Sequence, residues 1–204
     1  MYPAKPGLVI GFHGCDLSVR DGLVTGEITL SPSNNAYDWL GNGIYFWENN
    51  EQRALDFAHE IKSRRDREST IKTPAVVGAV LDIGFCLDLL DTKYIQLVKN
   101  SYIVLRVTYG KLSISLPSNY RIRNSKDLLL RNLDCAVIEK LHDRREKRNL
   151  PAFDSVRAAF VEGEPLYANA GFHEKNHIQI CIRNPNCIKG YFIPRKATNE
   201  WAVP

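Results

Sequence analysis

The sequence predicts one domain of the α+β class, and three observations indicate this. Short apolar stretches typical of strands are interleaved irregularly with three or so amphipathic helices, without a regular strand–helix repeat. A chain of 204 residues is long enough to bury a substantial core in one unit. No internal repeat, low-complexity segment or linker divides it. We therefore expect a single domain over residues 1–204.

The composition is typical of a globular protein and not of a disordered or membrane-spanning one. The chain is 44% hydrophobic and 25% charged, which is ordinary for a globular protein and argues against disorder. A net charge of +4 permits an anionic ligand without requiring nucleic acid. No apolar run approaches the roughly 20 residues of a membrane span, and residues 1–6 lack the apolar core of a signal peptide. We expect a cytoplasmic protein without a membrane partner.

The five cysteines indicate reduced thiols. Their number is odd, and most lie in apolar, strand-like surroundings. Cys181 and Cys187 are the nearest pair, and neither has a His or Cys partner at the spacing of a zinc site. We expect neither a disulfide framework nor a bound metal.

Periodicity predicts the elements in order. We expect strands over residues 8–13, 28–30, 75–85, 134–139, 156–161, 177–182 and 187–193. We expect helices over residues 17–23, 51–65, 91–109 and 125–133. The last two strands are predicted to form a hairpin around the turn at residues 184–186. The basic run 62–67 is interpreted as a solvated helix end, with a binding patch for nucleic acid or an acidic protein as the alternative, and the run 144–148 as a surface loop or helix end.

Two glycine-containing stretches stand out. Residues 9–14 read as a strand that ends in His13-Gly14, and the turn at residues 41–43 leads directly into Ile44-Tyr45-Phe46. Glycine permits a tight turn and the close approach of another backbone or a ligand. Tyr45 is predicted to lie at the mouth of its strand, where a ring can stack on a flat ligand. The glycine turn precedes a strand, so it is not a Rossmann fingerprint, which opens a helix.

This combination resembles the ADP-ribosyltransferases, specifically their poly(ADP-ribose)-polymerase-like branch, in which a His-Gly strand and a Gly-x-Gly-Ile-Tyr-Phe strand hold NAD. The resemblance covers residues 8–58, and residues 156–193 by the order of elements; it does not usefully cover residues 59–155. It implies a pair of split β-sheets flanked by helices, with NAD in the cleft between them as a substrate.

The resemblance also implies roles for single residues. His13 would hydrogen-bond a ribose hydroxyl of NAD, and the backbone of Gly14 would pair with the nicotinamide carboxamide. Tyr45 would stack on the nicotinamide ring, and Phe57 on the following helix is the best candidate for the other side. Cys15 stands where the family commonly has Ser or Thr.

The third catalytic position departs from the family. Polymer-forming members have Glu at the start of a late strand, and Gln179 aligns with it here, giving a catalytic set of His13, Tyr45 and Gln179. A shift of one or two residues would place His177 there instead. The preceding loop, which the resemblance makes the acceptor loop, offers further candidates: Glu162, Glu164, Tyr167, Phe172 and also Glu174. A compact domain rarely keeps so long a loop without a function.

These residues favour a mono-ADP-ribosyltransferase, because Gln can bind a ribose hydroxyl but cannot act as a general base. Such an enzyme could be a bacterial toxin-like or defence effector. An NAD glycohydrolase and a catalytically silent module that binds NAD or ADP-ribose are the alternatives. The RNA 2′-phosphotransferase branch of the same fold is a further alternative. That branch needs basic residues to bind an RNA phosphate, and the chain has two basic runs. Protein, RNA, DNA and a small molecule all stay open as the acceptor, and an inhibitory partner is also open.

Overall fold

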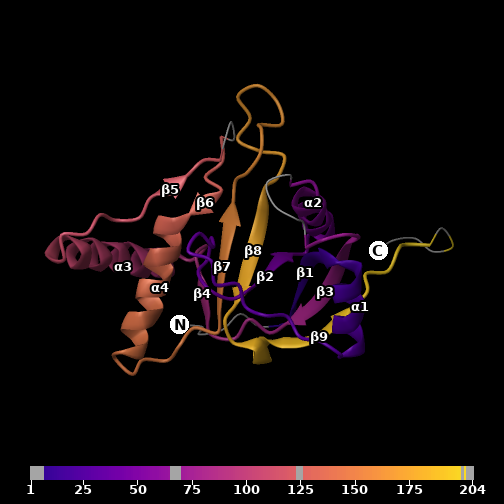
Figure 1. Cartoon of the computed structure of the whole chain (residues 1–204), viewed down its shortest axis with the longest axis horizontal. Coiled ribbons are helices and arrows are strands. Elements are labelled where there is room, and N and C mark those ends of the chain that lie inside the picture. Colours follow the sequence, from indigo (N-terminus) through magenta and orange to yellow (C-terminus); the bar gives the residue numbers. More distant parts are fainter. Residues whose placement is uncertain (1–6, 65–69, 123–125, 199, 201–204) are drawn as a thin grey trace.

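The computed structural model describes residues 7–64, 70–122, 126–198 and 200. Within these ranges the chain forms a seven-stranded mixed sheet, a two-stranded sheet and four helices (Figure 1). The predicted α+β class is confirmed. The strands of the large sheet are β1 (Val9–Asp16), β2 (Ile44–Glu48), β3 (Pro74–Leu81), β4 (Cys86–Asp88), β7 (Ser155–Phe160), β8 (His177–Ile182) and β9 (Ile188–Phe192). The helices are α1 (Leu17–Thr25), α2 (Glu51–Lys62), α3 (Thr92–Lys111) and α4 (Asn132–Glu146).

The large sheet has the strand order β4-β7-β8-β2-β1-β3-β9. Its neighbours run antiparallel, apart from the parallel pair of β4 and β7. One row of the register crosses four strands, with Phe12 opposite Trp47, Trp47 opposite Gln179, and Gln179 opposite Ala158. Side chains of one row share a face of the sheet, because neighbouring strands are pleated together. This row carries the candidate site.

Three helices pack on the face to which Trp47 points. Trp47 and Val76 form a small core with Ala54 of α2. Cys181, two residues beyond Gln179 and therefore on the same face, joins the larger core that includes Tyr94 of α3 and Ile138 of α4. Helix α1 covers the opposite face, where its Leu23 packs with Cys15 and Val77. Figure 1 shows α2 and α4 apart from one another, with the upper ends of β7 and β8 between them.

Several predicted elements are confirmed within a few residues, and their ends have local causes. Asn50 caps α2 by accepting a hydrogen bond from the Arg53 backbone N–H, and Asp91 caps α3 in the same way through Lys93. Helix α1 passes the predicted stop at residue 23 and ends at Gly26, whose φ of 78° is the left-handed C-cap conformation. The basic run 144–148 lies at the end of α4, as predicted, whereas the run 62–67 lies partly outside the described residues.

Three predicted elements are wrong. Residues 134–139 belong to α4 and not to a strand, and residues 28–30 form no strand. In the predicted helix 125–133, residues 126–129 form a loop and Leu130–Arg131 form β6, which pairs with β5 (Asn119–Tyr120). Residues 132 and 133 already begin α4, and Ser125 lies outside the described residues. The strand predicted over 75–85 ends at Leu81, because Gly84 turns the chain at a φ of 55° before β4 begins.

The predicted C-terminal hairpin is also wrong. After β8 the chain makes a short 3₁₀ turn (Pro185–Cys187), but β9 then pairs with β3 at the far edge of the sheet and not with β8. Gly78 of β3 leaves room for the ring of Phe192, which lies directly opposite it. Strand β9 thereby closes an edge that would otherwise expose unpaired backbone groups.

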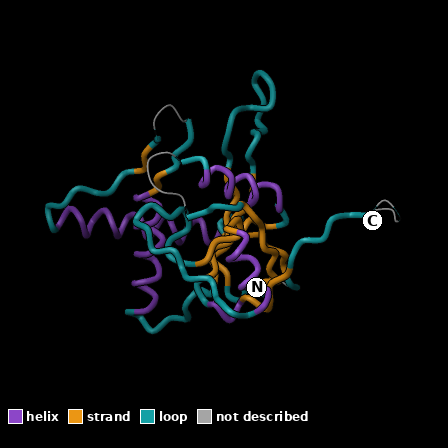
Figure 2. The backbone as a smooth tube through the Cα atoms, turned by 45° about the vertical axis from the view of Figure 1, so that its right-hand side comes forward, coloured by secondary structure: helices purple, strands orange, loops and turns teal. Residues whose placement is uncertain are grey.

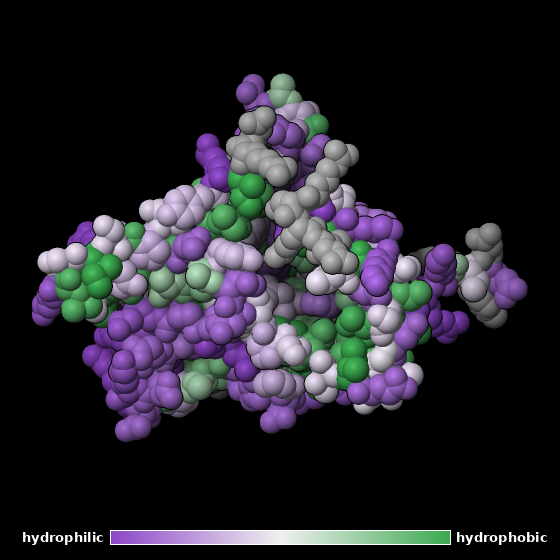
Figure 3. All heavy atoms as spheres, viewed as in Figure 1, coloured by the Kyte–Doolittle hydropathy of each residue, from purple (hydrophilic) through white to green (hydrophobic). Residues whose placement is uncertain are grey.

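The surface has regions of different character. Figure 3 shows hydrophilic side chains over α4 and an apolar cluster at the far end of α3, where Leu112 and Ile114 are exposed. All five cysteines are buried thiols. Among the residues that the structure describes, none of the helices combines the length and the apolar character needed to cross a membrane.

Candidate functional site

His13 lies at the point where β1 and β2 part. The ladder between these strands ends at the pair Phe12–Trp47, although β1 continues to pair with β3 as far as Asp16. Beyond the ladder, Nδ1 of His13 lies 2.8 Å from the carbonyl oxygen of Tyr45. A carbonyl can only accept, so Nδ1 carries the proton. Burial lowers the pKa of His13, so the ring is neutral near pH 7.

Gly14 is the point of contact between β1 and α2. A Cβ atom at this position would overlap the carbonyl oxygen of Ala54 and press on Ala58. The absence of a side chain thus lets α2 lie directly on the strand. The structure gives Gly14 a packing role, and its contact with a carboxamide stays a prediction.

The hydroxyl of Tyr45 is committed to the turn that precedes β2. It donates to the carbonyl of Gly41 at 2.5 Å and accepts from the backbone N–H of Leu40 at 2.9 Å. Its half-buried ring packs against the core beneath α4, and burial raises the pKa of the phenol. Tyr45 therefore fixes the shape of the glycine turn, and the stacking of its ring on a ligand stays a prediction.

Glu139 of α4 and Arg183 hold the same turn from outside. The Glu139 carboxylate accepts from the backbone N–H of Asn42 at 2.8 Å, and Arg183 donates to the Asn42 carbonyl at 2.9 Å. Arg183 and Glu139 are themselves ion-paired. Gly41 has a φ of 78° and no room for a side chain beside Glu139. The turn is thus fixed by charged groups from two distant segments.

Gln179 is placed beside Trp47, on the face of the sheet that Tyr45 also shares, and not beside His13. It is buried, and the pleat directs it to the same face as Trp47, with His177 two residues away on that face. The His13 side chain leaves the opposite face and packs edge-on against Phe46. The structure therefore joins His13 to Tyr45 through the Tyr45 carbonyl alone, while the side chains of Tyr45 and Gln179 lie on the face opposite to His13. Phe57 packs against Trp47, with ring centroids 4.9 Å apart.

The loop between β7 and β8 forms an ordered arm over residues 161–176, which projects above the sheet in Figures 1 and 2. Backbone hydrogen bonds link its two sides, from Leu166 N–H to Phe172 O and from Lys175 N–H to Glu162 O. Tyr167 and Phe172 are each 62% exposed near its end. The arm therefore presents aromatic side chains to solvent while its base is held against the domain.

The carboxylates of this arm have different surroundings. Glu162 is buried and accepts from Nη2 of Arg53 through both oxygens, at 3.1 and 3.2 Å. Glu164 is exposed and pairs with Lys126, and Glu174 is exposed as well. Of the three carboxylates considered from the sequence, Glu162 is the one that reaches the cluster around Gln179, since its Oε2 lies 3.7 Å from Nδ1 of His177.

Four buried polar atoms of this cluster have no hydrogen-bond partner among the described residues. They are Nε1 of Trp47, Nε of Arg53, Nε2 of His177 and Oε1 of Gln179. Burying such groups unpaired is costly, so a concentration of them on one face of a sheet indicates a place for a polar ligand. The sequence reasoning missed Trp47 and Arg53. A signal for Arg53 existed, because it lies one turn before Phe57 on the apolar stripe of α2.

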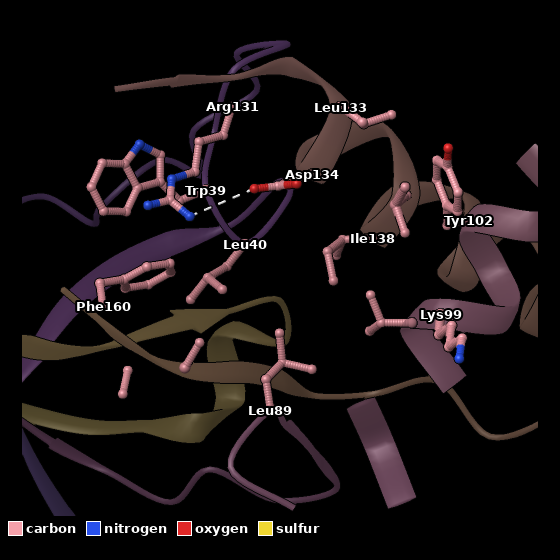
Figure 4. A pocket seen from close by; sticks show the side chains of 14 residues that line it. Trp39, Leu40, Leu89, Lys99, Tyr102, Arg131, Leu133, Asp134, Ile138 and Phe160 are labelled. Atoms are coloured by element: carbon pink, nitrogen blue, oxygen red, sulfur yellow. Dashed lines mark ion pairs between the residues drawn. The ribbon is translucent and has the colours of Figure 1, made fainter. Parts of the chain in front are cut away.

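A pocket of about 450 Å³ lies next to this cluster, between α3, α4 and β7 (Figure 4). At one end Arg131 stacks over the rings of Trp39 and Phe160, at 4.1 and 4.8 Å from the ring centroids, and pairs with Asp134. The rings of Trp39 and Phe160 also face His177, at centroid distances of 6.2 and 5.6 Å. These two rings therefore border both the pocket and the polar cluster.

Comparison with known proteins adds a distant relative. An uncharacterized protein of Methanocaldococcus jannaschii is 26% identical over 197 residues, covering 87% of this chain and 83% of its own. No family model matches the chain, and no solved structure matches it. The similarity to the archaeal protein extends over 87% of this chain, and because that protein is uncharacterized, it assigns no activity.

Proposed function

We propose that this protein is an NAD-dependent mono-ADP-ribosyltransferase that releases nicotinamide. One observation carries the proposal: His13, Tyr45 and Gln179, which are far apart in the sequence, lie on the adjacent strands β1, β2 and β8. The short ladder between β1 and β2 is where the split of the ADP-ribosyltransferase fold would lie, with His13 at its edge. The unpaired polar atoms around Gln179 support a polar substrate on the same strands.

The chemistry assigns Gln179 a binding role. Cleavage of the bond between nicotinamide and ribose builds positive charge on the ribose, as in glycoside hydrolysis. A hydrogen bond from the ribose 2′-hydroxyl to Oε1 of Gln179 would strengthen as that charge develops. An amide cannot remove a proton from the acceptor, so another group must activate it. We infer a single transfer of ADP-ribose, since no carboxylate stands at residue 179 to serve a growing chain.

The direct test is nicotinamide release from NAD by the purified protein, alone and with cell lysate. Release that needs lysate, with label transferred to a macromolecule, supports the transferase. Gln179→Met keeps the length of the side chain but lacks Oε1, so we expect it to lose most of the activity. Gln52→Met, at an exposed position of α2, is the matched control. Long polymer in the products would contradict the inference of a single transfer.

A silent NAD-binding or ADP-ribose-binding module is the second candidate, because the Tyr45 hydroxyl is committed to its turn and the polar cluster is buried. This candidate predicts a rise in melting temperature with NAD but no release of nicotinamide. A glycohydrolase would release nicotinamide and free ADP-ribose without lysate. If NAD gives no nicotinamide release and no shift in melting temperature, the NAD proposal as a whole is rejected.

A further inference from the structure

His177 has one committed ring nitrogen and one free ring nitrogen. Nδ1 lies 2.6 Å from the carbonyl oxygen of Lys175. Because the carbonyl only accepts, Nδ1 carries the proton and Nε2 holds a lone pair. Nε2 is buried and has no partner among the described residues. A neutral imidazole with an inward-facing lone pair has the form of a general base.

Burial keeps the His177 ring in this neutral form, and the charged groups around it act in opposite directions. Burial is the dominant influence and lowers its pKa, so the ring is neutral near pH 7. Glu162 lies on the Nδ1 side at 3.7 Å and raises the pKa, while Arg53 and Arg131 lower it. Arg53 in turn holds the Glu162 carboxylate through both oxygens. The carboxylate is thus placed to stabilise a proton gained by the ring.

The free nitrogen belongs to the part of the molecule where a substrate is proposed. His177 and Gln179 share one face of β8, and the Trp47 ring lies 6.4 Å from that of His177. The rings of Trp39 and Phe160, which line the pocket beneath Arg131 (Figure 4), have their centroids 6.2 and 5.6 Å from that of His177. The histidine therefore lies between the residue proposed to hold the ribose and a cavity large enough for a small acceptor group.

We propose that Nε2 of His177 accepts the proton of a hydroxyl acceptor in ADP-ribosyl transfer, an inference that rests on the function proposed above. The acceptor oxygen forms a bond to C1′ of the ribose, and its proton passes to Nε2. The bond between C1′ and the nicotinamide nitrogen breaks, and its electron pair leaves with neutral nicotinamide. The side chain of His177 is fully buried, so the rings of Trp39 and Phe160 must turn to admit the acceptor.

This role identifies the class of acceptor. A carboxylate is already deprotonated at neutral pH and gains nothing from a base, whereas a hydroxyl does. His177 therefore supplies what Gln179 lacks, and the acceptor is a hydroxyl group and not an acidic side chain.

The test uses two small nucleophiles in place of the acceptor. Methanol must lose a proton to attack C1′, whereas azide is an anion and has none to lose. Nicotinamide release and the ADP-ribosyl product are measured with each nucleophile for the wild type, His177→Gln and the control His59→Gln, which changes an exposed histidine of α2. We expect His177→Gln to lose about 100-fold or more of the methanol reaction, as for the loss of a general base. The azide reaction should change little, and His59→Gln should match the wild type.

An equal loss with both nucleophiles in a folded His177→Gln would overturn the role of His177 while leaving the transferase proposal in place. If that variant fails to fold, the pH dependence of the wild type decides. The methanol rate should fall on acidification below the usual histidine range, while the azide rate, divided by the concentration of the azide anion at each pH, holds. The same pH dependence for both would overturn the proposal. A wild type that releases no nicotinamide with either nucleophile rejects the proposed function and, with it, this inference.

Discussion

The carbonyl oxygen of Tyr45 accepts a hydrogen bond from Nδ1 of His13, 2.8 Å away, just beyond the last paired residues of β1 and β2. The histidine ring thus replaces a ladder bond at the place where the strands part. A buried carbonyl needs such a partner, and here a side chain provides it while the strands stay separated. The same two strands carry the residues by which the sequence resembles NAD-using enzymes.

Tyr45 is expected to stabilise the folded protein even when no ligand is bound. Tyr45→Phe removes the hydroxyl that bridges Gly41 and Leu40, and we expect a loss of about 1–3 kcal/mol in the free energy of unfolding. Tyr45→Ala would also open a cavity, at about 3–5 kcal/mol in total, so it is a poor probe of ligand binding. Urea denaturation followed by circular dichroism measures both. Tyr167→Phe, on the exposed arm, is the control, and equal effects at residues 45 and 167 would contradict the hydrogen bonds described.

The ion pair between Arg53 and Glu162 is expected to matter far more than that between Lys126 and Glu164. Glu162→Leu removes the buried partner of the Arg53 guanidinium and leaves it only the longer contact with Glu60, at 3.5 Å, which costs about 3–5 kcal/mol. Glu164→Leu breaks an exposed pair worth about 0–1 kcal/mol. Both free energies of unfolding come from denaturant titration. A small effect at Glu162 would show that the base of the arm is not held against α2.

Gly14 is expected to tolerate no side chain. Gly14→Ala forces α2 away from β1, and overpacking of this kind costs about 1–3 kcal/mol or more. Gly190→Ala places the same methyl group in β9 with no atom within 4 Å, so we expect almost no change. Thermal unfolding of the two variants provides the comparison. Equal melting temperatures would contradict the close contact of α2 with Gly14.

Stability is expected to fall on acidification through the titration of buried histidines. Burial, and then the nearby Arg183, lower the pKa of His142 to about 4 from an ordinary value of 6.5. Between these values the unfolded chain binds a proton that the folded chain does not, so the free energy of unfolding decreases as the pH is lowered. His13 and His177 act in the same direction, since their pKa values are lowered too.

His142→Gln should therefore flatten part of this pH dependence. Denaturant titrations at several pH values between 4 and 7 measure the slope for this variant, the wild type and His59→Gln. An unchanged slope in His142→Gln, with the same slope in the exposed control, would show that His142 is protonated in the folded protein.

The main prediction error concerns α4, where a continuous apolar run was interpreted as a strand. Cys135, Val137 and Ile138 are all buried, and a short apolar run does not distinguish a buried strand from a buried helix. Extending the window to Leu141, which is also buried, reveals helical spacing. Local pattern was therefore sufficient here, but only over a longer stretch.

The pairing of β9 had no such local signal. Its strand character was predictable from residues 187–193, yet its neighbour was not. A turn followed by a strand usually makes a hairpin, and the alternative depends on which sheet edge is open. That edge is formed by β3, more than a hundred residues earlier in the chain.

The sequence by itself determined the α+β class, the strands that carry His13, Tyr45 and Gln179, and the helix that follows Tyr45, because periodicity and capping are local properties. Only the tertiary structure decided which side chains meet. It separated Gln179 from His13 by the pleat of the sheet, placed Arg53 and Glu162 in one buried ion pair, and left Nε2 of His177 without a partner. These relationships depend on strand register and on the packing of distant segments, which no local pattern encodes.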